Sequence, residues 1–316
     1  MKEFNYEELL QILESEDCKD YYEPSLQKPN SDKLKELLDK HIDSENIQSK
    51  TVLGIDIYRY SKYKELPQNL VPFVSDLLLK ETIRQCLKGE NFIFQQFKNE
   101  NSFMKAFINT GDGGFFIFDT PIHAIVFAIH FEVILRTFNS FHFYPKLRNI
   151  MGNVSLRYSM TYDKVYKYKN SHYGPGIITN ARILSKDKLN RFLIDENSYE
   201  WLLLNINGVE NLQTLLLNEI HHINEFETYN KKRMSSLIFV PPKIRNHYYS
   251  LEGIILGINN VDIQKIGEIE AKQDKMSIYN LHIQYSTIFS DEKDDAKSSK
   301  FTISLGNLNV SGISDE

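Results

Sequence analysis

The stretch FINTGDGGFFIFD, residues 107–119, decides how this chain folds. Two β-prone runs flank a glycine-rich turn, a pattern that predicts a β-hairpin. The turn places the carboxylate of Asp112 at the tip, and glycines on both sides leave room for a ligand. Because Asp-Gly is also a favoured turn pair, the alternative interpretation is that Asp112 only shapes the turn.

A second acid, Asp56, ends the apolar run at residues 51–55. If this run and the hairpin are neighbouring strands of one sheet, Asp56 and Asp112 converge. Two carboxylates repel each other unless a cation sits between them, and hard divalent ions prefer oxygen ligands. The pair therefore predicts a divalent metal site, with a purely structural pair of acids as the alternative.

Composition limits the class of protein. The 316 residues are 41% hydrophobic and 25% charged, as in soluble globular proteins, and the net charge of -5 gives no basic field for nucleic acid. Cys18 and Cys86 lie far apart without metal-ligand spacing, which is typical of reduced thiols in a cytoplasmic protein. The N-terminus lacks a signal-peptide pattern, and the most apolar segment, 122–135, is too short and too polar to span a bilayer. We expect a cytoplasmic protein that binds neither nucleic acid nor membrane.

Apolar periodicity predicts three units: an N-terminal helical appendage at 1–49, a catalytic domain at 50–235 and a small β-rich unit at 236–316. Helices are expected near residues 6–14, 31–42, 69–87, 121–138 and 178–185. Strands are expected at 51–58, 92–97, 103–108, 115–118, 154–168, 254–256, 277–289 and 300–310, with a solvated loop at 291–299. This order predicts an α+β fold in which helices pack against a mainly antiparallel sheet.

Three segments together resemble the class III nucleotidyl cyclase domain: GIDIYRYS at 54–61, NTGDGGFFIF at 109–118 and HYGPGIITNARIL at 172–184. The likeness covers roughly residues 50–204. It implies a ferredoxin-type antiparallel sheet, a nucleoside triphosphate substrate, two divalent metal ions (Mn²⁺ or Mg²⁺) and a homodimer with sites at its interface.

The resemblance also implies a role for individual residues. Asp56, Asp112 and the backbone carbonyl of Ile57 would hold the metal ions. The third segment would supply Gly176, then Asn180 to orient the ribose and Arg182 to stabilise the α-phosphate. Backbone N–H groups where the first strand meets its helix would cradle the outer phosphates, at Tyr58, Arg59, Tyr60 and Ser61.

One departure from the family concerns spacing. The family places its Asn and Arg four residues apart, whereas Asn180 and Arg182 are two apart. Positions i and i+2 of a helix point to different faces. Arg182 is therefore the stronger candidate, and the alternative is a polar helix residue beside a solvated arginine.

A second departure concerns the base. Purine cyclases carry a Lys and an Asp or Thr where this chain has Ile108 and Tyr173. Without the lysine, the chain lacks a hydrogen-bond donor that the edge of a purine base requires, which argues against ATP as the substrate. The pattern is similar to the uridylate and cytidylate cyclases of bacterial Pycsar antiphage systems. It implies conversion of UTP or CTP to the 3′,5′-cyclic monophosphate and pyrophosphate, as a signal for a separate effector protein. The alternative functions are a purine cyclase and an inactive nucleotide-binding module. The aromatic residues at 58–60 either suit a small base or pack against the edge of the sheet.

Overall fold

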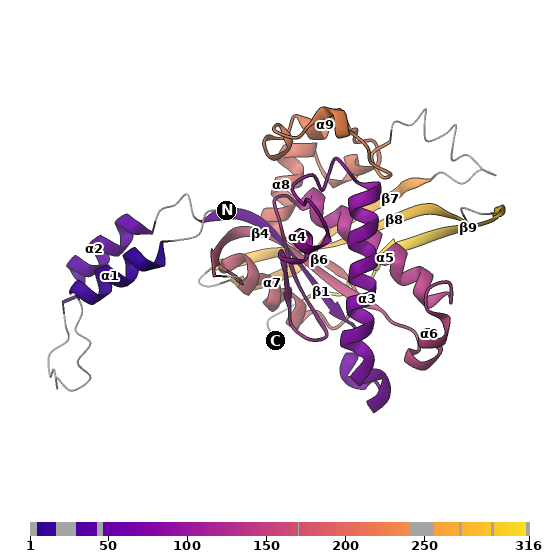
Figure 1. Ribbon diagram of the computed structural model, residues 1–316, viewed down its shortest axis with the longest axis horizontal. Coiled ribbons are helices and arrows are strands. Elements are labelled where there is room, and N and C mark those ends of the chain that lie inside the picture. Colours follow the sequence, from indigo (N-terminus) through magenta and orange to yellow (C-terminus); the bar gives the residue numbers. More distant parts are fainter. Residues whose placement is uncertain are drawn as a thin grey trace.

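The computed structural model describes residues 5–16, 30–42, 47–169, 171–240, 256–271, 274–291 and 294–313. Within these ranges the centre of the molecule is a nine-stranded sheet in the order β2-β3-β1-β4-β6-β8-β7, with β5 beside β4 and β9 beside β8 (Figure 1). All pairs are antiparallel except β4 and β6. The strands are β1 (Gln48–Ile57), β2 (Phe107–Asn109), β3 (Gly113–Phe118), β4 (Leu156–Tyr168), β5 (Ser171–Tyr173), β6 (Phe192–Asp195), β7 (Gly257–Ala271), β8 (Asp274–Asp291) and β9 (Asp294–Leu305).

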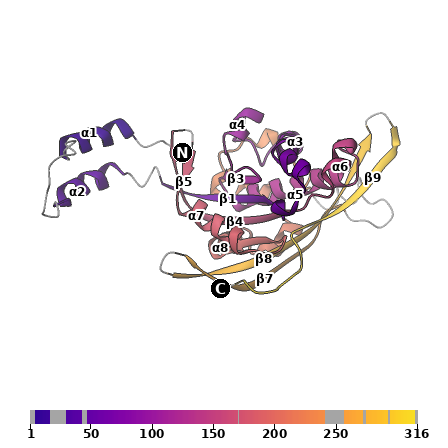
Figure 2. The same cartoon turned by 90° about the horizontal axis from the view of Figure 1, so that it is seen from below.

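Helices cover both faces of the sheet, with α3 and α5 on one face and α7 on the other (Figure 2). Side chains of β1 alternate between the faces, as in any strand. Leu53 and Ile55 enter the core beneath α3 and α5, whereas Val52 and Gly54 lie under α7. The helices are α1 (Tyr6–Glu16), α2 (Asp32–His41), α3 (Glu65–Gly89), α4 (Glu100–Met104), α5 (Pro121–Asn139), α6 (Pro145–Met151), α7 (Pro175–Lys186), α8 (Glu196–Ile206) and α9 (Leu217–His221).

The first half of the domain has the order β1, α3, the hairpin β2–β3, α5 and β4. This is a βαββαβ arrangement with β1 between β3 and β4. The predicted α+β fold with a ferredoxin-type sheet is therefore confirmed. The predicted N-terminal helices are also present as α1 and α2, which pack on each other beside the sheet (Figure 1).

Helix α5 is the centre of the core. Apolar residues surround it almost completely, and nearly all of its length is buried. Its length and composition would also allow it to cross a membrane, but burial on all sides is what a core helix requires. It begins as expected, with Pro121 in its first turn after Thr120. Of the two cysteines, Cys86 is a buried thiol in α3, and Cys18 lies outside the described residues.

Helix α7 approaches β1 unusually closely because of Gly54. A β-carbon at this position would overlap the side chains of Asn180 and Ser159. The side-chain amide of Asn180 instead donates to the carbonyls of Val52 (2.7 Å) and Ser159 (3.2 Å), and its oxygen accepts from the Ser159 hydroxyl. The asparagine therefore fastens α7 to two strands.

The predicted strand at 92–97 is wrong, and the predicted strand at 103–108 is right only at its end. Residues 92–97 form turns, whose rings pack into the core rather than pairing in a ladder. Phe103, expected in a strand at 103–108, lies in α4, and only Phe107–Asn109 is extended. The cause is local: Asn99 accepts from the N–H of Ser102 (2.9 Å) and caps a short helix that apolar alternation does not reveal.

The C-terminal strands differ in extent from those predicted. Strand β7 was not expected, and of the predicted strand at 254–256 only Leu256 is described, just before β7. Strand β8 contains the predicted 277–289. Strand β9 ends at Leu305 and occupies most of the predicted loop at 291–299, of which 292–293 lie outside the described residues. Because β8 pairs with β6, these strands extend the central sheet. The division of the chain into three units stays a prediction.

Candidate active site

Strand register brings the two acids of the sequence motif together. Asp56 pairs with Gly113 across β1 and β3, and the N–H of Ile57 donates to the carbonyl of Asp112 at 3.1 Å. A side chain at Gly113 would overlap the carbonyl of Ile55, and Gly111 has a φ of 108°, so the turn needs glycine at both positions. Asp112 therefore lies over the end of β1, next to Asp56.

The electrostatics of Asp56 reflect this placement. Burial raises the pKa of the Asp56 carboxyl, and Arg157 opposes that effect. The charge of Asp112 and a side-chain hydrogen bond with it raise the pKa of Asp56 further. Two carboxyl groups in contact favour a shared proton or cation. Their convergence is thus a feature of the fold, whereas their role as metal ligands stays a prediction.

Arg157 is the residue of this site that sequence reasoning missed. It stands opposite Asp56 across β1 and β4, and its Nε donates to Oδ2 of Asp56. Its Nη1 donates to the carbonyl of Asp187 at 2.5 Å, at the end of α7. The two residues are 101 positions apart in the sequence, and the pairing of β1 with β4 brings them together. No local sequence pattern reveals such a contact.

The protein atoms available to a metal ion are few. In the described ranges no group of three or more His, Cys, Asp or Glu side chains is placed to hold a metal. Asp56 and Asp112 supply two carboxylates, and Ile57 follows with a backbone carbonyl. Mg²⁺ is commonly held by one or two carboxylates together with water and substrate phosphates. The donor set therefore fits a metal that arrives with a nucleotide better than a permanent structural ion.

Fewer backbone N–H groups are free in the predicted phosphate-binding segment at residues 58–61 than we expected. The N–H of Tyr58 donates to the carbonyl of Ser155 at 2.9 Å, and its hydroxyl donates to the carbonyl of Lys188 at 3.1 Å. Including Tyr58 as an amide donor to phosphate is therefore wrong, because its N–H already has an acceptor. Arg59 is exposed with a φ of 59°, and a short turn at Tyr60–Lys62 follows with Ser61 at the surface.

The two candidates on α7 point in opposite directions. Asn180 is fully buried against the sheet, where its amide has the partners described above. Arg182 is exposed on the outer face of the helix, which it shares with Ile178, one turn earlier and 55% exposed. Gly176 packs beside Val52 and Val165. Of Gly176, Asn180 and Arg182, only Arg182 presents a functional group to solvent.

Of the two candidate base-contacting residues, Ile108 belongs to the hairpin that carries Asp112, whereas Tyr173 lies away from the acids. Ile108 is half-buried in β2, packed on the small cluster that includes Val52. Tyr173 is 44% exposed and pairs with Tyr166 between β5 and β4. Arg157, beside Asp56, lies nine positions earlier in β4, so at about 3.3 Å per residue roughly 30 Å separates Tyr173 from the acids. A single chain does not bring Tyr173 to the carboxyl pair.

Comparisons with known proteins give a distant likeness in fold. No family model matches the chain, and no curated protein matches it. The chain is similar to the crystal structure of the guanylyl cyclase Cya2, with 11% identity, a TM-score of 0.38 and coverage of 74% of this chain and 92% of that one. It is also similar to the adenylyl cyclase CyaB from P. aeruginosa (12%, 0.39, 74% and 95%) and to the guanylate cyclase domain of RhGC from Catenaria anguillulae in complex with GTP (12%, 0.40, 74% and 96%). Likeness at this level does not assign an activity, which must be inferred from the side chains of the site.

Proposed function

We propose that this chain is a metal-dependent nucleotidyl cyclase that acts on a pyrimidine nucleoside triphosphate, UTP in preference to CTP. The observation that carries the proposal is the contact between Asp56 and Asp112 at the end of β1. Two partly buried carboxylates in contact repel each other, and a divalent cation between them would relieve that repulsion. The motif resemblance over residues 54–61 and 109–118 adds the nucleotide.

The proposed reaction closes a ring. The ribose 3′-oxygen attacks the α-phosphorus, the bond from that phosphorus to the bridging oxygen of the β-phosphate breaks, and pyrophosphate leaves while the 3′-hydroxyl proton passes to water. Asp56 and Asp112 would hold divalent ions, which when bound would lower the pKa of the hydroxyl and neutralise charge on the phosphates. Arg157, which lies beside Asp56, would donate to the triphosphate, for which its guanidinium fork is suited.

A homodimer completes the site in this proposal. Arg182 and Tyr173 are both exposed, and Tyr173 is far from the acids of its own chain. A second copy that packs against the outer face of α7 would bring its own Asp56 and Asp112 towards Arg182. The arginine would then stabilise negative charge that grows on the α-phosphate in the transition state.

The proposed preference for a pyrimidine rests on two positions. Ile108 has no hydrogen-bonding side chain at the position where purine cyclases have a lysine, and Tyr173 stands in place of their carboxyl or hydroxyl residue. A site built on hydrogen bonds discriminates strongly against a ligand that leaves them unmade. A pyrimidine product would then act on a separate effector protein, in keeping with antiphage signalling.

A nucleotide-binding module without turnover is the second candidate. The ion pair between Arg157 and Asp56 favours it, because an arginine in place of the metal neutralises the acid. The burial of Asn180 favours it as well, since its amide is committed to Val52 and Ser159.

One experiment separates these functions. The protein is incubated with an equimolar mixture of the four ribonucleoside triphosphates and Mn²⁺ or Mg²⁺, and the products are identified by mass spectrometry. The proposal predicts cyclic UMP, with less cyclic CMP, and pyrophosphate. Cyclic AMP or cyclic GMP as the main product indicates a purine cyclase. Nucleotide binding without any cyclic product indicates the inactive module.

A further inference from the structure

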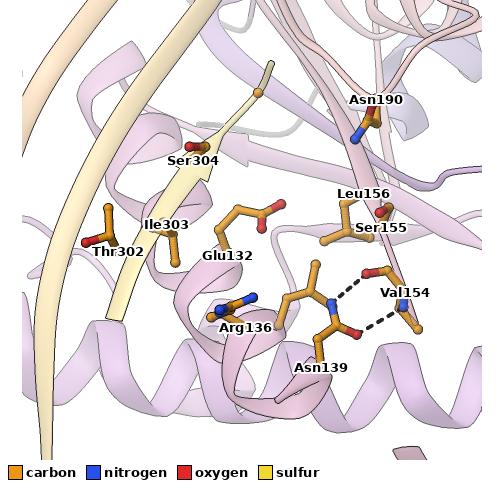
Figure 3. Close-up of a pocket in the computed structure, with 12 residues that line it drawn as sticks. Glu132, Arg136, Asn139, Val154, Ser155, Leu156, Asn190, Thr302, Ile303 and Ser304 are labelled. Atoms are coloured by element: carbon orange, nitrogen blue, oxygen red, sulfur yellow. Dashed lines mark hydrogen bonds between the residues drawn. The ribbon is translucent and has the colours of Figure 1, made fainter. Parts of the chain in front are cut away.

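A polar cavity lies between helix α5, the start of β4 and strand β9, on the side of β4 away from α7 (Figure 3). It has a volume of about 230 Å³. Its walls come from three parts of the chain, and the C-terminal strand β9 closes one side. The lining residues used below are Glu132, Arg136, Asn139, Ser155, Asn190 and Ser304.

Two opposite charges in this cavity do not pair with each other. Glu132 and Arg136 are four residues apart on α5, the spacing and order that favour an ion pair on a helix. Among the described residues no ion pair joins them, and Figure 3 shows the carboxyl of Glu132 on the side of the cavity that faces Leu156. Glu132 instead accepts a hydrogen bond from the hydroxyl of Tyr158 at 3.0 Å. Arg136 is exposed at the mouth of the cavity.

The carboxyl of Glu132 is poised between its two protonation states. Burial raises its pKa to about 7, and the hydrogen bond from Tyr158 opposes part of that effect. Tyr158 occupies one carboxyl oxygen, Oε1. The Glu132 carboxyl can therefore accept from, or donate to, a hydroxyl group of a molecule in the cavity.

The rest of the wall combines polar side chains with the apolar Leu135, Leu156 and Ile303. The side chain of Asn139 donates to the carbonyl of Val154 (2.7 Å) and accepts from its N–H (3.0 Å), which fixes the start of β4 against α5. Asn190, Ser155 and Ser304 add an amide and two hydroxyl groups around the open space. A wall of this chemistry suits a hydroxylated ligand rather than an apolar one.

We propose that this cavity is a binding site for a small hydroxylated organic phosphate, in which Arg136 holds the phosphate and Glu132 contacts a sugar hydroxyl. Arg136 carries a planar fork of donors that matches a phosphate, and no ion pair with a described residue competes for it. Ligand pockets for drug-sized molecules usually enclose about 300 Å³ or more. The smaller volume here fits a pentose phosphate or the sugar-phosphate half of a nucleoside monophosphate.

The cavity also shares a wall with the candidate active site. The carbonyl of Ser155 accepts the N–H of Tyr58, two residues after Asp56, and Leu156 pairs with Ile57 across β4 and β1. A ligand that fixes the start of β4 would therefore also fix the end of β1. This consequence for turnover rests on the proposed function, whereas binding in the cavity does not.

Calorimetric titration of the full chain tests the site in EDTA, so that no divalent ion promotes nucleotide binding at Asp56. The probes are ribose 5-phosphate, 5′-UMP, inorganic phosphate and ribose. We expect saturable binding of ribose 5-phosphate, and at least about ten-fold weaker binding by Arg136→Ala because a charge-assisted contact is lost. Glu132→Gln keeps the size of the side chain. It is expected to weaken the binding of ribose 5-phosphate more than the binding of inorganic phosphate.

Two variants serve as controls. Arg233→Ala removes an exposed arginine elsewhere, and Asp112→Asn alters the candidate active site. Both should bind ribose 5-phosphate as the unaltered chain does. If 5′-UMP binds at least as tightly and also depends on Arg136, the natural ligand is a nucleoside monophosphate with the same chemistry.

Three results would overturn the proposal. The first is no saturable binding of any phosphorylated probe. The second is that Arg136→Ala binds ribose 5-phosphate as tightly as the unaltered chain does, while the midpoint of its thermal unfolding is also unchanged. The third is inorganic phosphate that binds as tightly as ribose 5-phosphate, because the hydroxyl-lined wall would then contribute nothing. None of these results affects the assay for cyclic product, so the two proposals fail separately.

Discussion

Two acidic residues, Asp187 and Asp56, lie on either side of Arg157, and their surroundings differ. Asp187 is buried with Arg191, whose guanidinium approaches its Oδ1 at 2.7 Å and also donates to the carbonyl of Ser311. Asp56 instead faces a second carboxyl, Asp112, and shares Arg157 with the carbonyl of Asp187. One region has its charge balanced inside the chain. The other holds two carboxyl groups and one guanidinium at the end of a strand, and this is why we propose that a cation from outside binds there.

The largest expected effect is on turnover. Asp112→Ala removes one of two carboxylates and should abolish formation of cyclic nucleotide, because one remaining carboxylate binds Mg²⁺ or Mn²⁺ too weakly. Product is measured by mass spectrometry with Asp76→Ala, an exposed acid of α3, as the control. Unchanged cyclic product from Asp112→Ala would falsify the metal assignment.

The balanced region should matter for stability instead. Arg191→Met leaves Asp187 as a buried charge without its partner, and we expect a loss of about 3–5 kcal/mol in the free energy of unfolding. Urea denaturation measures it. Lys80→Met breaks the exposed pair with Asp76 and should cost about 0.5 kcal/mol or less after screening by solvent. Equal losses in the two variants would mean that the buried ion pair stabilises the fold no more than the exposed one does.

Helix α7 offers a matched pair of substitutions. Arg182→Ala should lower kcat by about 10²–10³-fold with little change in stability, because its side chain faces solvent and would meet substrate only in the proposed dimer. Asn180→Ala should destabilise the fold by about 1–3 kcal/mol, since the carbonyl of Val52 loses its donor.

Mixing two inactive variants tests whether Arg182 acts across the dimer. A mixture of Asp112→Ala and Arg182→Ala should regain activity, because a hybrid dimer contains one intact site. If each variant keeps the same activity when mixed as when alone, Arg182 does not act on a partner chain.

The smallest expected effect is on pH dependence. The pKa of Asp56 is raised in the folded state, so its contribution to stability is complete below the ordinary value of 3.8 and declines as pH rises through the raised pKa. Asp112→Ala removes one cause of that rise. At pH 7 without metal the variant should therefore gain about 1 kcal/mol or less in the free energy of unfolding. Urea denaturation at several pH values measures it, and a loss of stability at neutral pH would contradict repulsion between the two acids.

Local sequence patterns predicted the parts of the site that local structure determines. The glycine-rich turn and the strand ending at Asp56 fix where the two acids lie. Helical periodicity correctly separated Asn180 from Arg182, because residues two apart cannot share a face. Arg157 was not predictable in this way, since its place beside Asp56 depends on strand pairing.

The errors in the fold have more than one origin. Phe92 and its neighbours have strand-like composition, but they fill the aromatic core from turns. Strand β7 pairs with β8, which itself joins β6, and such long-range pairing leaves little trace in the periodicity of one segment. Local turns and helices were therefore easier to predict than strand partners.

Mn²⁺ binding tests the central claim, a cation shared by Asp56 and Asp112, most directly. Electron paramagnetic resonance measures free Mn²⁺ during titration of the protein with a non-reactive UTP analogue, for the unaltered chain, Asp56→Asn, Asp112→Asn and the control Asp76→Asn. The shared site predicts tight Mn²⁺ binding by the unaltered chain and the control, and weak binding by each of the other two variants. Retention of tight binding by both Asp56→Asn and Asp112→Asn would contradict it.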